Sequence, residues 1–219
     1  MLNSVNAFLY NGFNILWFMI MLPLVAAVLI LLSGKQHVLR LVLTVLFASA
    51  NFISALSLYI SEGFYVKIPF ASFGLDMALR VYEYSSLFIL LAAGAFLPVS
   101  MYSAAFLKGR SFSGLFMMYM FVSLAMINGA ILSDNLGIML FFWEGLLCTL
   151  FGMLMINNMG NPKTAVKALV LSGTADLLLM IGIIITACSA GTPYASEMGR
   201  LPVTGVSGLG FVFMMLGAI

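Results

Sequence analysis

The sequence predicts an all-α integral membrane protein with about seven transmembrane helices, at about 20 residues for each crossing. Of its 219 residues, 63% are hydrophobic and only 7% are charged. Its mean hydropathy is +1.17, whereas soluble domains contain about 45–50% apolar and about 25% charged residues. Apolar runs such as Ile15–Leu32 are unbroken, which is typical of membrane helices, because strands of a membrane β-barrel alternate apolar and polar residues. A soluble domain and a disordered chain are therefore excluded.

Seven apolar segments are each expected to form a helix in the membrane. They span 13–33, 38–60, 84–106, 112–132, 136–157, 164–189 and 205 to the end. Pro162 is expected near the start of the sixth helix, where a missing N–H costs little. Pro23 and Pro98 fall inside the first and third segments, where they are expected to kink the helices, which membrane helices tolerate.

The last segment is shorter than the others. Its roughly 15 residues give about 22 Å of helix at 1.5 Å per residue, less than the roughly 30 Å thickness of the hydrocarbon layer. We therefore expect a truncated helix whose remainder follows in a longer product or is supplied by another chain. The chain is interpreted as one membrane domain over 1–219, with a three-helix segment over 1–106 and a second part over 112–219.

Basic residues predict the orientation of the helices. Lys35 and Arg40 follow the first segment, Lys108 and Arg110 follow the third, and Lys163 follows the fifth, with Lys167 close behind. None of these connections contains an acid, whereas the opposite connections mix Asp and Glu with Lys and Arg. Because short loops rich in Lys and Arg stay in the cytoplasm, the N-terminus is predicted to lie outside.

Several chemistries are excluded by what the sequence lacks. The net charge of +2 is small and dispersed, so no basic stripe for nucleic acid exists. Cys148 and Cys188 lie in apolar stretches without His or Cys at ligand spacing, which excludes a metal centre and a disulfide framework. The sequence contains no GxGxxG or GxxxxGK[ST] motif. No cofactor is therefore expected on this chain, nor a redox site of its own.

Three ionisable residues inside the predicted helices carry most of the functional information. Glu144 lies deep in the fifth segment, Asp176 lies at a similar depth in the sixth, and Lys167 lies about one turn inside the sixth. An ionisable side chain in a membrane helix costs about 2.5–3.5 kcal/mol at the centre and indicates function by default. We interpret all three as candidate proton-transfer residues. Two alternatives stay open: Lys167 as a snorkelling anchor, and Asp176 as a structural hydrogen-bond partner.

The order of these residues resembles one family of membrane proteins. The quoted motifs are Ser133-Asp134-Asn135, Trp143-Glu144-Gly145-Leu146-Leu147-Cys148, Ala165-Val166-Lys167-Ala168-Leu169 and Ala175-Asp176. They resemble the antiporter-like, proton-translocating membrane subunits of respiratory complex I, of group 4 membrane-bound hydrogenases such as formate hydrogenlyase, and of multisubunit Na⁺/H⁺ antiporters. The resemblance implies a fold of about 14 helices in two inverted halves, of which this chain holds the first part.

The resemblance also implies roles for single residues. Glu144 matches the glutamate of the fifth helix that takes part in proton transfer with a lysine of the seventh helix. Lys167 matches the lysine that opens the sixth helix, and Asp176 matches a membrane acid later in that helix. Some family members carry arginine where this chain has Gly173, so an ion pair within the sixth helix is absent here.

Three functions follow as expectations. The first is a proton-translocating, or Na⁺-translocating, subunit of a redox-driven complex related to NADH:quinone oxidoreductase or a membrane-bound hydrogenase. Its partners would be other membrane subunits, peripheral redox subunits and the lipid of a bacterial or archaeal cytoplasmic membrane. The second is a subunit of a multisubunit Na⁺/H⁺ antiporter. The third is a truncated scaffold fragment that transports nothing, since the family's lysine of the seventh helix would follow Ile219.

Overall fold

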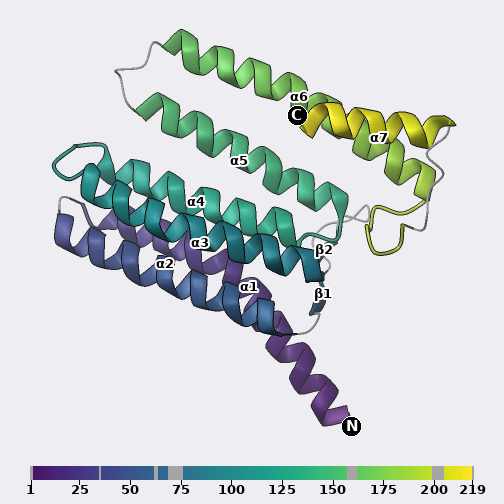
Figure 1. Cartoon of the computed structure of the whole chain (residues 1–219), viewed down its shortest axis with the longest axis horizontal. Coiled ribbons are helices and arrows are strands. Elements are labelled where there is room, and N and C mark those ends of the chain that lie inside the picture. Colours follow the sequence, from purple (N-terminus) through teal and green to yellow (C-terminus); the bar gives the residue numbers. More distant parts are fainter. Residues whose placement is uncertain are drawn as a thin grey trace.

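The computed structural model describes residues 2–34, 36–61, 64–68, 76–156, 162–198 and 205–218, without the side chains of residues 2–14, 162, 164 and 218. Helices account for most of the described chain (Figure 1). They are α1 (Leu2–Leu32), α2 (His37–Ile60), α3 (Glu83–Phe106), α4 (Ser113–Leu132), α5 (Leu136–Ile156), α6 (Pro162–Ala190) and α7 (Gly205–Ala218). Two short strands, β1 (Tyr65–Ile68) and β2 (Met77–Arg80), lie between α2 and α3.

The structure confirms the all-α membrane fold. Within the described chain, 6 helices are long and apolar enough to cross a membrane, and α7 is a shorter apolar helix. Helix α6 begins at Pro162, as expected, and α1 and α3 run through Pro23 and Pro98. The largest difference is at the N-terminus, where α1 begins at Leu2 and not near residue 13.

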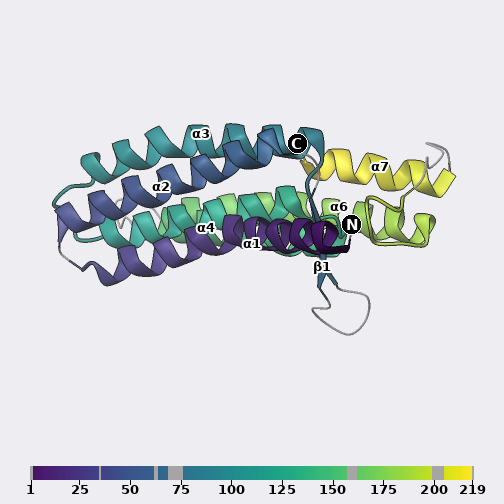
Figure 2. The same ribbon diagram turned by 90° about the horizontal axis from the view of Figure 1, so that it is seen from below.

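The helices form two layers (Figure 2). Helices α1, α4, α5 and α6 lie side by side in that order in one layer. In the second layer, α2 and α3 pack on α1 and α4, and α7 packs on α6. Helix α5 therefore lies at the junction between a four-helix bundle and the α6–α7 pair.

Buried amides connect three helices of the four-helix bundle. The Asn128 Nδ2 group of α4 donates to the Met19 carbonyl oxygen of α1 at 2.8 Å and to Asn51 Oδ1 of α2 at 3.1 Å. Both amides are fully buried. Because lipid offers no competing hydrogen bonds, these contacts fix how the three helices pack against one another.

Arg40 was used in the sequence analysis only to predict the orientation of the helices, but in the structure its side chain is buried and makes packing contacts. Its guanidinium is buried and donates from Nη1 to Ser113 Oγ at the start of α4. It also donates from Nη2 to the Gly34 carbonyl oxygen in the α1–α2 turn. Arg40 thus ties two helix connections together at the end of the bundle that is predicted to lie inside, a role that its position in the sequence does not indicate.

Glycines allow α6 and α7 to pack at very short range. A methyl group at Gly217 would lie 2.4 Å from the Leu179 backbone nitrogen, and one at Gly182 would lie 2.5 Å from the Met214 backbone nitrogen. A methyl group at Gly210 would lie 2.8 Å from Thr186 Oγ1. Small residues at such contacts are typical of membrane helices, whose association depends on close packing.

The orientation of the chain stays a prediction that cysteine labelling tests. In a variant with Cys148 and Cys188 replaced by serine, Ala195→Cys is expected to react with an impermeant maleimide added outside intact cells, and Lys108→Cys is not. Both positions are exposed, and they lie in connections on opposite ends of the helices. Asp134, although it also lies in a predicted outer connection, is fully buried and unsuited to labelling. Labelling of position 108 alone would contradict the predicted orientation and would place the N-terminus inside. Lys35, Glu62 and Arg200, which also entered the orientation argument, lie outside the described residues.

Candidate functional site

Glu144 lies on a partly open face of α5. It follows Leu136 by eight residues, about 12 Å along the helix, and its side chain is half-buried. Phe141 and Cys148, three residues before it and four after it, are exposed, so all three share one helix face. Among the described residues, the structure gives the Glu144 carboxylate no hydrogen bond and no ion pair. The carboxylate is thus held in the span without a fixed partner.

Asp176 is the buried acid of the site. Its side chain is 7% exposed, and its Oδ1 atom accepts a hydrogen bond from Trp143 Nε1 of α5 at 2.8 Å. Because Trp143 precedes Glu144, this bond supports the expectation that the two acids lie at a similar depth.

A cleft lies beside Asp176. It has a volume of about 240 Å³ and is lined by Trp143 and three leucines of α5, by Ser172, Ala175 and Asp176 of α6, and by Gly217 of α7. This volume has room for several water molecules. The cleft gives Asp176 a hydratable surface next to Ser172, while its leucines, Ala175 and Gly217 form apolar walls.

Lys167 lies away from the two acids. It is exposed on α6 and precedes Asp176 by nine residues, which is about 13 Å along the axis and about half a turn around it. No ion pair joins Lys167 to Glu144 or Asp176 in the described part of the chain. The structure thus brings Glu144, Trp143 and Asp176 together but leaves Lys167 on another face.

The sequence did not predict the hydrogen bond of Trp143 to Asp176. The indole N–H is a donor that a bilayer cannot satisfy, so a Trp at this depth signals an acceptor on a neighbouring helix. The acceptor is Asp176 and not Glu144, which the sequence places next to it.

Asp134 forms a second polar cluster outside the membrane spans. It is fully buried, and its Oδ1 atom accepts hydrogen bonds from Tyr82 Oη at 2.8 Å and from the Ser196 backbone N–H at 2.9 Å. Its Oδ2 atom accepts a third from Ser196 Oγ at 2.6 Å. Asp134 therefore joins the start of α3 to the connection between α6 and α7.

The β-hairpin reinforces this junction. Strands β1 and β2 pair antiparallel, and the Asp134 backbone N–H donates to the Ala78 carbonyl oxygen at 2.8 Å. Asp76, next to β2, accepts a hydrogen bond from Tyr194 Oη at 2.9 Å and pairs with Lys67 Nζ at 3.4 Å. We call Asp76, Tyr82, Asp134, Tyr194 and Ser196 the outer clamp. The sequence motif Ser133-Asp134-Asn135 includes one member of the outer clamp, but it did not indicate the contacts of Asp134.

Comparison with known proteins gives structural matches only. No family model matches the sequence, and no curated protein matches it. The structure is similar to a chain of the Mrp complex from Dietzia sp. DQ12-45-1b, with a TM-score of 0.83 and 18% identity over 93% of this chain and 23% of that one.

Two further structures have the same fold over less than half of their length. One is the membrane-bound sulfane sulfur reductase, an archaeal respiratory membrane complex, with a TM-score of 0.71 and 19% identity over 92% of this chain and 43% of that one. The other is respiratory complex I from Thermus thermophilus, with a TM-score of 0.72 and 21% identity over 91% and 43%. The three matches confirm the antiporter-like membrane fold expected from the sequence motifs, and this chain spans less than half of each matching chain.

Proposed function

We propose that this chain is part of an ion-translocating, antiporter-like membrane subunit of a multisubunit complex. The observation that carries the proposal is the pair of acids at mid-helix, Glu144 and Asp176, of which Asp176 lines a hydratable cleft, in a fold shared with chains of three membrane complexes. Acids at this depth are costly and are typical of proton relays. The matching complexes support membrane subunits as partners, and their sources favour a bacterial or archaeal cytoplasmic membrane.

Two carboxylates on neighbouring membrane helices suit proton transfer. When both are ionised, their repulsion favours uptake of one proton, and an approaching cation favours its release. Glu144 has no fixed partner in the described chain, so we assign it the proton that moves. Asp176, anchored by Trp143, is assigned the fixed charge that Glu144 responds to.

Two functions fit this proposal, and they differ in which ion moves and in what drives its movement. A redox-driven proton pump is our first candidate, with redox chemistry on peripheral subunits. A Na⁺/H⁺ antiporter subunit is the second, favoured by the TM-score of 0.83 with the Mrp complex.

The test uses the complete subunit in its complex, reconstituted in vesicles. Proton uptake driven by an electron donor, without added Na⁺, would support the pump. Proton movement driven only by a Na⁺ gradient would support the antiporter. A complex that assembles but moves neither ion would contradict both and support the scaffold interpretation.

Lys167 is expected to matter more than a lipid-interface anchor should. Lys167→Arg keeps the charge but removes easy deprotonation, so translocation is expected to fall by about tenfold or more if the lysine carries protons. The measurement is proton uptake in the same vesicles. Lys163→Arg, one turn earlier on α6, is the control and should leave uptake unchanged. Normal uptake by Lys167→Arg would show that the residue is an anchor, as its exposed position permits.

A further inference from the structure

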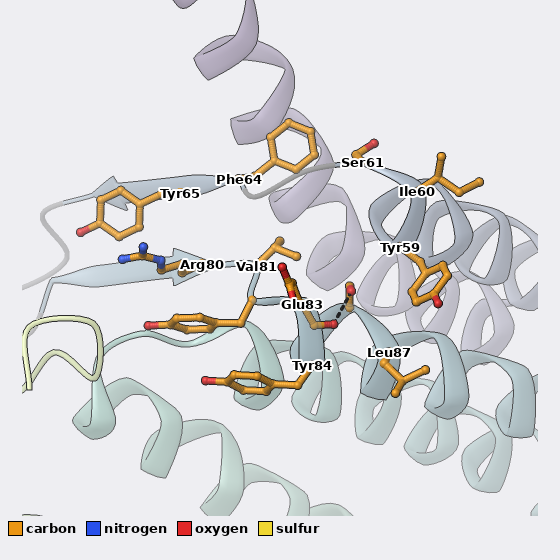
Figure 3. A pocket seen from close by; sticks show the side chains of 12 residues that line it. Tyr59, Ile60, Ser61, Phe64, Tyr65, Arg80, Val81, Glu83, Tyr84 and Leu87 are labelled. Atoms are coloured by element: carbon orange, nitrogen blue, oxygen red, sulfur yellow. Dashed lines mark hydrogen bonds between the residues drawn. The ribbon is translucent and has the colours of Figure 1, made fainter. Parts of the chain in front are cut away.

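A large pocket opens where α2 ends and α3 begins, away from the two acids. It has a volume of about 1140 Å³, at or above the roughly 300–1,000 Å³ of ordinary small-molecule sites. Figure 3 shows Tyr59, Ile60 and Leu87 on one side and the hairpin residues Tyr65 and Arg80 on the other. Because both helices end here, the pocket lies at the boundary between hydrocarbon and water.

The Arg80 side chain is a cation in this pocket that two aromatic rings position. The Arg80 guanidinium lies 5.6 Å from the ring centre of Tyr65 and 5.1 Å from that of Tyr82. Within the described chain, no carboxylate lies close enough to Arg80 to form an ion pair. Ring faces hold a guanidinium without using its N–H donors, so the Arg80 donors stay available for an anion such as a phosphate.

One anion lines the same pocket. Glu83, the first residue of α3, is exposed. The negative charge of Glu83 and the positive charge of Arg80 give the residues that line the pocket a net charge of zero. A headgroup with both a phosphate and an ammonium group therefore matches the lining better than an anionic headgroup, which Glu83 would repel. A primary ammonium also donates hydrogen bonds that a quaternary one cannot.

The apolar side of the pocket continues along the helices. Ile60 is 75% exposed, and Leu56, one turn earlier on α2, is also exposed. Leu87 and Leu91 form the same kind of pair on α3. Residues four apart share a helix face, so each pair extends an apolar surface from the pocket into the hydrocarbon layer. This surface suits acyl chains.

From this match of charge and shape, we propose that the pocket binds a zwitterionic aminophospholipid, phosphatidylethanolamine. Its phosphate binds Arg80, its ammonium group binds Glu83, and its acyl chains follow Leu56 and Leu91. The bound lipid fills the space between the β-hairpin and the two helices. Its site lies on the side of the membrane that carries the outer clamp.

The test is lipid retention by the purified full chain in detergent. After delipidation, the protein is titrated with dioleoyl phosphatidylethanolamine, phosphatidylcholine or phosphatidylglycerol, and bound lipid is measured by native mass spectrometry. Phosphatidylethanolamine is expected to bind tightest. Arg80→Gln and Glu83→Gln are each expected to weaken it by about tenfold, as loss of a charge-assisted hydrogen bond predicts. Lys108→Gln, an exposed cation at the other end of the helices, controls for net charge.

Folding is checked by circular dichroism and by melting without lipid. If Arg80→Gln does not fold, Glu83→Gln decides, because Glu83 is exposed and, among the described residues, its carboxylate makes no hydrogen bond or ion pair. Parent-level retention of phosphatidylethanolamine by a folded Glu83→Gln variant would overturn the proposal. A preference for phosphatidylglycerol that depends on Arg80 alone would also overturn it and would indicate an anionic-lipid site.

Discussion

Replacing Glu144 by glutamine is expected to abolish ion translocation while the complex still assembles. Glutamine keeps the shape of the side chain but cannot exchange a proton, so uptake should fall by about a hundredfold or more. The structure supports intact folding, because the Glu144 carboxylate makes no hydrogen bond or ion pair within the described chain. The measurement is proton uptake in vesicles by the complete subunit in its complex, with assembly followed on native gels.

Two variants make this result interpretable. Glu144→Asp keeps a titratable group at a shorter reach and should retain part of the activity. Cys148→Ser changes the exposed neighbour one turn along the same helix face and should leave uptake unchanged. Normal pumping by Glu144→Gln would remove this residue from the mechanism, whereas failure to assemble would show that it is structural.

Replacing Asp134 by alanine is expected to give the largest loss of stability. The carboxylate is fully buried and accepts three hydrogen bonds, from Tyr82 Oη, Ser196 N–H and Ser196 Oγ. Its removal leaves these donors unpaired, at a cost of about 2–4 kcal/mol. We expect a lower melting temperature in detergent and faster trypsin cleavage at Arg200, which follows the clamped segment in the sequence. Glu197→Gln, an acid in the same connection whose carboxylate is exposed, is the control. Unchanged cleavage in Asp134→Ala would show that the outer clamp does not hold this connection.

Alkaline pH should open the same clamp. Burial, together with the hydrogen bond to Asp134, raises the pKa of Tyr82 from 10.0 to about 12. A raised pKa means that the folded state favours the neutral phenol, so this contribution to stability is complete below pH 10.0 and is lost as the pH rises toward about 12. Tyr82→Phe should remove this step from the pH dependence of melting. A step that persists in the phenylalanine variant would have to come from another group.

Hydropathy predicted the helices well because each one is a separate apolar segment. The starts of α2 and α3 are within one residue of those expected, since charged or turn residues flank each span. The start of α1 was not predicted, because hydropathy detects only the apolar part of a helix. Leu2–Gly12 is less apolar than the span that follows, yet it belongs to the same helix. The β-hairpin was missed because its two strands are only four residues each.

The candidate site was predicted in its residues but not in its geometry. Charge in an apolar segment singles out Glu144, Lys167 and Asp176 without any structure. Which of them face one another depends on helix phase and packing, and spacing along one helix already separates Lys167 from Asp176 by about half a turn. The partner of Asp176 comes from another helix, through Trp143. The outer clamp is less visible still, because Asp134 and Ser196 are distant in sequence and only the fold makes them neighbours.

The glycines between α6 and α7 limit how this part of the molecule can move. Sliding one helix along the other would bring side chains such as Met214 against backbone that now has room only for hydrogen. We therefore expect α6 and α7 to move as one rigid body. Rearrangement during a transport cycle is then directed to the looser seam between α5 and α6, where the cleft lies. Any tilt of the α6–α7 pair would lengthen or break the hydrogen bond from Trp143 to Asp176. The state of this hydrogen bond would therefore change during the transport cycle. The indole fluorescence of Trp143 would report it, in a variant with Trp17 replaced by phenylalanine.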